Sequence, residues 1–127
     1  MKTALLAVLL AAAAAPAQAL VWQVWNKSDS AVSVETVNAG CDNKTRALGP
    51  TTGFTQMDWR GGCTGTCAYN VYVRWTDAKG VPYCKHWFTA PGSLVNACKS
   101  QKVTISGSSP WLGLSGFKGT WYSEDCI

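Results

Sequence analysis

The sequence predicts a single all-β domain, an antiparallel β-sandwich or small barrel with about eight short strands, stabilised by three disulfides. Short runs of β-branched and aromatic residues alternate with clusters of Gly, Pro, Asn, Asp and Ser, which is the pattern of strands and turns. No segment after residue 19 has a convincing helical period. Six cysteines follow an apolar N-terminal segment, and an even number in that context indicates disulfides formed in an oxidising compartment.

The first 19 residues have the features of a secretory signal peptide. Lys2 gives a positive start, residues 4–15 are apolar without interruption, and residues 16–19 end in small side chains suited to cleavage. The apolar run is well short of the roughly 20 residues that a membrane-spanning helix needs. We therefore expect a signal peptide over 1–19, a secreted extracellular β-sandwich domain over 20–127, and no transmembrane segment.

The predicted strands are separated by turn residues. Residues 27–30 form a good turn, so the first two strands are expected to make a hairpin. The clearest strand is 67–75, in which alternate side chains are apolar and polar, as in a strand with one face on the core. Residues 40–52 and 90–100 are expected to be loops. The strands are expected over residues 20–26, 31–38, 53–59, 67–75, 81–89, 101–106, 111–114 and 119–122.

A second hairpin is expected to be centred near Ala78 and Lys79. That centre would pair Val73 with Tyr83 and Tyr72 with Cys84. It would also place one set of side chains opposite the core face, because side chains in a strand alternate between two faces. This second face is more aromatic than a solvated face requires, and it holds Asn70, Tyr72, Cys84, His86 and Phe88.

The cysteines are expected to form the disulfide framework, although the sequence permits many pairings. A bridge between Cys41 and Cys126 would close the longest loop. The spacing of Cys63 and Cys67 suits a zinc site, but a secreted chain without further ligands in register favours disulfides, so no metal is expected. The six residues are Cys41, Cys63, Cys67, Cys84, Cys98 and Cys126.

Catalytic chemistry has little support in the sequence. His86 is the only histidine, so a ribonuclease that uses two imidazoles is excluded. A single histidine acting with Glu35, Glu124 or Asp125 stays open, although nothing in the sequence brings such a pair together. A Cys–His protease would need a free thiol, which the even cysteine count disfavours. Carboxylates are scattered and no phosphate-binding loop opens a helix, so we expect a non-enzymatic protein without a cofactor.

Aromatic residues are the most unusual feature. The chain has seven Trp, four Tyr and three Phe, and so many large side chains are hard to bury completely in a small domain. Trp111, which follows a Ser-Ser-Pro turn, is the one most readily exposed. Exposed aromatic rings suit contact with a sugar, lipid or protein. The candidate binding surface consists of Trp111, Tyr72, His86 and Phe88.

Two further features bear on where the protein acts. Asn26 and Asn43 each begin an Asn-X-Ser/Thr triplet and are candidate glycosylation sites in a eukaryotic producer. The formal net charge is +4, and it falls to about +3 without Lys2. The positive residues form no dense run, so no nucleic-acid partner is indicated.

A series of short features runs along the chain, most of them in its second half: 21–26, 28–29, 64–66, Asp77, Gly80, 91–93, Asn96, 103–107, Trp111, 115–116 and 119–120. Their order resembles that in the aegerolysins, small β-sandwich proteins of fungi and bacteria. The resemblance implies binding to membrane lipids, often sphingolipids with particular head groups, and in some members pore formation with a larger partner. Aegerolysins usually lack a cleaved signal, are acidic and have few cysteines, whereas this chain has the signal features, is basic and has six cysteines. No motif matches closely enough to carry over lipid-contacting residues one by one.

These observations favour a secreted non-enzymatic binding protein. A microbial effector, virulence factor or toxin-like protein, for example from a fungus, fits the small size and the cysteine framework. Its partner would be a protein, glycan or lipid on a host or competitor surface. The alternatives are a membrane-lipid-binding or antimicrobial protein that uses Trp and Lys at a lipid interface, a small secreted hydrolase or ribonuclease that depends on His86, and an enzyme inhibitor.

Overall fold

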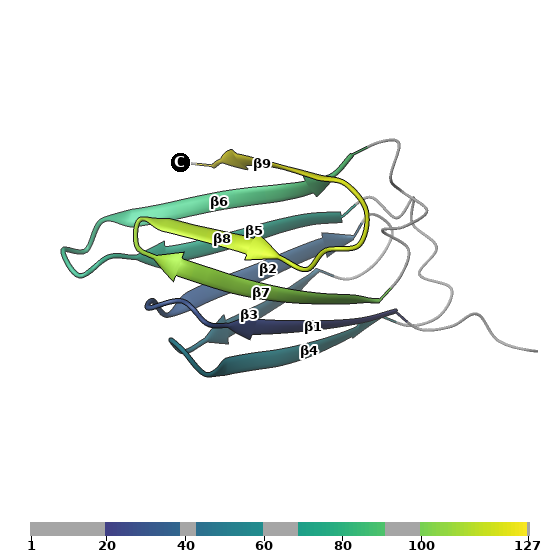
Figure 1. Ribbon diagram of the computed structural model, residues 1–127, viewed down its shortest axis with the longest axis horizontal. Coiled ribbons are helices and arrows are strands. Elements are labelled where there is room, and N and C mark those ends of the chain that lie inside the picture. Colours follow the sequence, from purple (N-terminus) through teal and green to yellow (C-terminus); the bar gives the residue numbers. More distant parts are fainter. Residues whose placement is uncertain (1–19, 39–42, 60–68, 91–99, 127) are drawn as a thin grey trace, which may run out of the picture.

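The computed structural model describes residues 20–38, 43–59, 69–90 and 100–126. These residues form an all-β sandwich of two sheets (Figure 1), which confirms the predicted fold class. The signal-peptide prediction falls on residues 1–19, outside the described residues. The described strands are β1 (Leu20–Asn26), β2 (Val32–Asn38), β3 (Lys44–Leu48), β4 (Gly53–Trp59), β5 (Tyr69–Thr76), β6 (Pro82–Thr89), β7 (Gln101–Ser108), β8 (Trp111–Ser115) and β9 (Trp121–Asp125).

One sheet has the strand order β4-β1-β7-β8 and the other has the order β3-β2-β5-β6-β9 (Figure 1). Neighbouring strands are antiparallel except β1 and β7, which are parallel. On one side, β3 and β4 follow each other directly and contact across the two sheets. On the other side, β8 and β9 are the outermost strands. The two sheets are therefore linked by contacts on the β3–β4 side.

The predicted hairpin of the first two strands is wrong, because β1 and β2 lie in different sheets. The residues between them carry the chain across the sandwich. Asn26 and Ser28 are both fully buried, and the Asn26 Oδ1 accepts hydrogen bonds from the Ser28 amide at 3.0 Å and from its hydroxyl at 2.6 Å. A tight two-strand turn would leave these groups in solvent, whereas here they form the corner of the fold.

The second hairpin forms as predicted, but its register is shifted by two residues. Tyr72 is opposite His86, and Val73 is opposite Lys85. The loop covers residues 77–81 instead of 76–80, and the Asp77 Oδ1 holds it by accepting hydrogen bonds from the amides of Lys79 and Val81, each at 2.9 Å. Since a shift of two residues preserves the alternation of faces, the predicted division of side chains between the two faces is retained.

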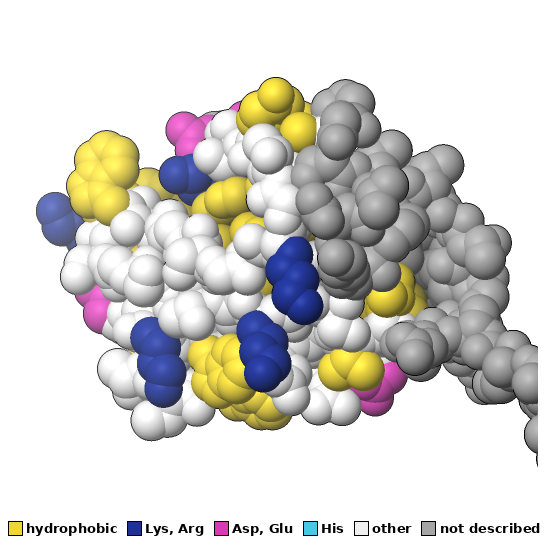
Figure 2. Space-filling model, turned by 45° about the vertical axis from the view of Figure 1, so that its right-hand side comes forward, with side chains coloured by type: hydrophobic (Ala, Val, Ile, Leu, Met, Phe, Trp, Pro, Cys, Tyr) yellow, Lys and Arg dark blue, Asp and Glu magenta, His cyan; other side chains and the backbone are white. Residues whose placement is uncertain are grey.

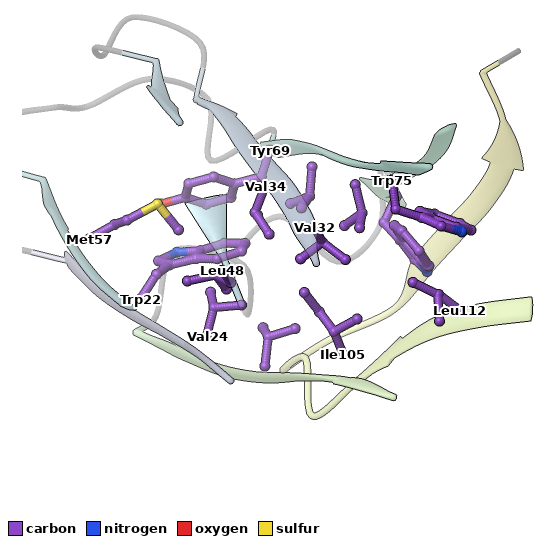
Figure 3. Close-up of a cluster of buried hydrophobic side chains, with 14 of the residues drawn as sticks. Trp22, Val24, Val32, Val34, Leu48, Met57, Tyr69, Trp75, Ile105 and Leu112 are labelled. Carbon is purple, nitrogen blue, oxygen red and sulfur yellow. The ribbon is translucent and has the colours of Figure 1, made fainter. Parts of the chain in front are cut away.

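The core lies between the sheets (Figure 3). Trp22 lies toward one end of the core (Figure 3), with its ring centroid 4.9 Å from that of Tyr69 and 5.9 Å from that of Trp59. These side chains pack together because alternate residues of each strand face inward. The buried hydrophobic cluster comprises Trp22, Val24, Val32, Val34, Leu48, Met57, Trp59, Tyr69, Val71, Val73, Trp75, Trp87, Val103, Ile105 and Leu112.

One strand was not expected. β3 lies inside the segment predicted to be a loop, and it pairs antiparallel with β2. Its side chains alternate only weakly between apolar and polar, as is common for a short strand at the edge of a sheet. The final strand begins later than predicted and extends to Asp125.

The described disulfide joins Cys84 to Cys126. The suggested bridge between Cys41 and Cys126 is therefore wrong. Cys84 and Cys126 meet because β9 lies beside β6, and the Cys126 amide also donates to the Cys84 carbonyl at 3.1 Å. The other predicted disulfide residues, Cys41, Cys63, Cys67 and Cys98, lie outside the described residues.

The two candidate glycosylation sites differ in exposure. Asn43 is exposed and is compatible with a glycan. Asn26 is fully buried, and its Nδ2 donates to the carbonyls of Ser30, Leu48 and Gly49. A glycan would replace one hydrogen of that nitrogen and has no room at a fully buried side chain, so the folded structure is incompatible with a glycan on Asn26.

Candidate functional site

The four residues of the predicted binding surface fall in two places. Tyr72, His86 and Phe88 lie together on the outer face of the five-stranded sheet, where β5 and β6 pair. Trp111 lies elsewhere, at the hairpin between β7 and β8. The structure therefore offers two candidate sites, and their geometry distinguishes them.

The first site is a row of contacting rings, which we call the aromatic ladder, formed by Tyr72, His86, Phe88 and Tyr122. Tyr72 and His86 stack with ring centroids 4.4 Å apart and planes 7° apart. Phe88 contacts His86 at 5.1 Å and Tyr122 at 5.7 Å. The Arg74 guanidinium lies over the Tyr72 ring and pairs with Glu35 at 3.0 Å. Because Tyr72 and His86 stack face to face, much of the flat surface of these two rings is used inside the protein.

His86 is held by partners on both ring nitrogens. Its Nδ1 lies 3.0 Å from the Glu124 Oε1, and its Nε2 lies 2.7 Å from the Asn70 Oδ1. The sheet brings this pair together because Glu124 of β9 is directly opposite His86 of β6. Of the three carboxylates considered as partners, Glu124 is thus the one that contacts His86. With both nitrogens occupied and the ring stacked on Tyr72, the arrangement favours a structural role over proton transfer.

The second site is a cleft of about 680 Å³ between β8 and the β6–β9 edge of the other sheet. We call it the edge cleft. Its volume is in the range of roughly 300–1,000 Å³ that is typical of ligand pockets. Trp75 and Tyr83 stack in its wall, with centroids 5.6 Å apart and planes 18° apart. The lining includes Trp75, Tyr83, Lys85, Trp111, Leu112 and Asp125.

Trp111 stands at the mouth of the edge cleft and is 83% exposed. The turn that carries it is held at Ser109, whose amide donates to the Asp29 Oδ1 and whose hydroxyl accepts from the Trp75 Nε1, both at 3.1 Å. Gly107 has a φ of +105°, and a Cβ there would collide with the Trp111 carbonyl. The exposed ring is therefore presented by a fixed turn.

Hydrogen bonds also order the polar side of the edge cleft. The Tyr83 hydroxyl donates to the Asp77 Oδ2 at 3.2 Å. Burial and the nearby Asp77 carboxylate raise the pKa of the Tyr83 hydroxyl, so it remains a protonated donor at neutral pH. Lys85 and Asp125 are directly opposite each other on β6 and β9.

Several cleft residues were missed by sequence reasoning. In β6, Lys85 lies between Tyr83 and Trp87 in the set of alternate residues whose side chains face the core. A lysine at such a position signals that the sheets separate there, because a buried ammonium without a partner is costly. Asp125 gave no such signal, because from the sequence it was considered only as a possible partner of His86. Trp111, by contrast, is exposed as its turn context predicted.

Within the described ranges, no three His, Cys, Asp or Glu side chains are grouped so that they could hold a metal ion. In the same part of the chain, no helix is long and apolar enough to cross a membrane. Comparison with protein-family models, curated proteins and solved structures found no match.

Proposed function

We propose that this chain is a secreted, non-enzymatic binding protein that engages a component of a host or competitor surface through the edge cleft. The exposure of Trp111 on a fixed turn beside that cleft carries the proposal. A tryptophan has a large rigid apolar body and few rotatable bonds, so it gains much contact area for little loss of entropy when a ligand covers it. The small size and the cysteine framework support an effector or toxin-like role.

The surroundings of His86 favour a binding function over a catalytic one. Both of its ring nitrogens contact protein oxygens, and its side chain is only 12% exposed. A general base needs a nitrogen within reach of a substrate proton. The hydrolase alternative therefore requires His86 to leave Asn70 or Glu124 before it can act.

The proposal is tested by comparing the wild-type mature protein with Trp111→Ala. Each protein would be fluorescently labelled and incubated with fungal, bacterial, plant and mammalian cells, and bound protein would be measured by flow cytometry. We expect at least one surface to bind the wild type, and Trp111→Ala to lose roughly tenfold or more of that binding because the ring supplies central contact area.

Tyr122→Ala is the matched control, because Tyr122 is an exposed aromatic residue (53%) outside the edge cleft. This variant should bind like the wild type. Near-UV circular dichroism establishes that all three proteins are folded. Equal binding by Trp111→Ala, or no binding of the folded wild type to any surface, would contradict the proposal. His86→Ala, tested alongside for activity on RNA and polysaccharide substrates, addresses the hydrolase alternative.

A second candidate function, binding to anionic membrane lipids, is favoured by the outer face of the four-stranded sheet. Trp25 and Phe54 contact there at 5.1 Å, and Phe54 is 47% exposed. Lys102 and Lys118 line a shallow hollow over β1 and β7. Figure 2 shows Lys or Arg side chains beside hydrophobic ones on this side of the molecule. Co-sedimentation with phosphatidylserine vesicles, lost in Phe54→Ala and not in Trp111→Ala, would support this alternative.

A further inference from the structure

We propose that the ligand of the edge cleft is a neutral carbohydrate chain, an inference that rests on the function proposed above and gives it a substrate class. Three properties of the cleft support it: an exposed aromatic platform, a pair of opposite charges that can share a hydroxyl group, and an open rim. The residues that provide these properties come from parts of the sequence that lie far apart.

The platform is Trp111, and the wall beside it is formed by Tyr83, which is half-buried and stacks on the buried Trp75. Sugar rings have an apolar face of C–H groups, and such faces pack against aromatic rings, which are rigid and carry a negative π-surface. Trp111 is 83% exposed at the mouth, while Trp75 is 6% exposed in the wall. A sugar unit can therefore cover Trp111 while its neighbour lies against the wall.

The polar groups are Lys85 and Asp125. They face each other across the β6–β9 pair and both line the cleft. The Lys85 Nζ lies over the Trp87 ring, 5.6 Å from its centroid. No described ion pair or hydrogen bond involves the Asp125 carboxylate. An ammonium and a carboxylate placed in this way can donate to and accept from the same hydroxyl, and bonds to charged groups are the stronger ones.

The charge of this pair also limits the ligand. Lys85 and Asp125 sum to zero, so the pair gives neither an acidic sugar nor a cationic ligand a net electrostatic attraction. A neutral polyol satisfies both groups. A zwitterionic lipid head group is the main competitor, because it also carries one charge of each sign, and the experiment must separate the two.

The rim residues Pro82, Trp111 and Asp125 are exposed. A chain longer than the cleft can therefore extend into solvent at either end, as a surface polysaccharide requires. The cleft volume of about 680 Å³ suits a short segment of such a chain.

The test is a glycan array of neutral, uronic-acid and sialylated oligosaccharides probed with the mature protein, together with phosphatidylcholine and sphingomyelin vesicles. The neutral oligosaccharide with the strongest signal would then be titrated calorimetrically. We expect binding to neutral glycans, weakened roughly tenfold or more in Trp111→Ala and in Asp125→Asn. Lys85→Gln should weaken it as well, whereas Trp111→Tyr should recover most of the affinity and Tyr122→Ala should leave it unchanged.

The outcomes separate the two proposals. Binding only to acidic glycans, or only to vesicles, would overturn the carbohydrate inference while the binding function stands. If Tyr122→Ala abolishes binding to neutral glycans and Trp111→Ala does not, the binding site lies on the aromatic ladder. That result would overturn the assignment of the site to the edge cleft. If the folded wild type binds no neutral glycan, the carbohydrate inference is overturned. The proposed binding function would still stand if binding to cells depends on Trp111.

Discussion

At the scale of single residues, Asn26 shows how one buried amide organises a corner. Its Oδ1 accepts from the amide and the hydroxyl of Ser28, and its Nδ2 contacts carbonyls of both the β1–β2 and the β3–β4 connections. All of its polar atoms are therefore satisfied inside the protein, as buried polar groups require. The Asn26-Lys27-Ser28 triplet is consequently better explained by this network than by glycosylation.

Replacement of Asn26 by Ala should be strongly destabilising. The free energy of unfolding is expected to fall by roughly 2–4 kcal/mol, because several buried donors and acceptors lose their partners at once. Urea denaturation followed by tryptophan fluorescence measures this change. Asn43→Ala is the matched control, since Asn43 is exposed and its loss should change stability by no more than about 0.5 kcal/mol. Equal effects of the two substitutions would show that the corner network contributes little.

At the scale of elements, the β5–β6 hairpin depends on the loop that closes it. Asp77 binds two backbone amides of the loop through its Oδ1 and the Tyr83 hydroxyl through its Oδ2. Gly80 adopts a φ of +83°, which few other residues tolerate. The hydrogen bond from the Val81 amide is the main cause of the lowered pKa of Asp77, relative to an ordinary value of 3.8.

This lowered pKa predicts a dependence of stability on pH. Because the folded state holds Asp77 ionised more strongly than the unfolded state does, its contribution is present above about pH 4 and is lost as pH falls through the lowered value. In Asp77→Asn, the free energy of unfolding should therefore vary less steeply with pH in the acid range. Some slope should persist, since hydrogen bonds from Ser30 and then Ser109 also lower the pKa of Asp29.

Denaturation of both proteins at a series of pH values between about 2 and 6 measures the difference. Asp58→Asn serves as the control, because the Asp58 carboxylate accepts a side-chain hydrogen bond from Gln56 and closes no loop. Identical profiles for the wild type and Asp77→Asn would contradict the proposed coupling between this carboxylate and the hairpin.

The elements also show what the sequence could predict. The positions of β1, β4 and β6 follow from local alternation and turn residues, so they were predicted to within a residue or two. Which strands pair with one another, and in which register, could not be predicted in the same way. The order of strands depends on the buried Asn26 corner, and the hairpin register depends on hydrogen bonds from the Asp77 side chain. Both are polar contacts that a hydrophobic pattern does not encode.

In the candidate site, too, local features could be predicted from the sequence, whereas contacts that depend on strand pairing could not. The exposure of Trp111 follows from its place beside a Ser-Ser-Pro turn, so it was predictable. The placement of Lys85 opposite Asp125, and the contact of His86 with Glu124, depend on β9 pairing with β6. That pairing brings together residues far apart in the chain, and no local pattern specifies it.

At the scale of the whole molecule, the disulfide fixes the end of the chain. Cys126 follows β9, whose one partner among the described strands is β6, and the bond to Cys84 closes a separation of 42 residues. A link of this kind reduces the freedom of the unfolded chain. It also keeps Asp125, which precedes Cys126, against the edge cleft.

Replacement of both Cys84 and Cys126 by Ser should therefore lower the free energy of unfolding by about 2–4 kcal/mol, measured by urea denaturation. The same variant should show faster hydrogen exchange at the amides of β9 than at those of β5, because β9 lies at the sheet edge. Peptide mapping of the intact protein under non-reducing conditions should recover a fragment in which Cys84 is linked to Cys126. Recovery of Cys126 linked to any other cysteine would contradict the assignment.

The position of β1 in its sheet has a consequence for how the protein is made. β1 is the first strand of the domain, yet its neighbours are β4 and β7, and its pairing with β7 joins residues about 80 positions apart. During synthesis β4 can pair with one edge of β1 early, but the other edge of β1 stays unpaired until β7 emerges. Contacts between such distant residues slow folding, so the interval before residue 108 appears is when the chain most needs protection from aggregation.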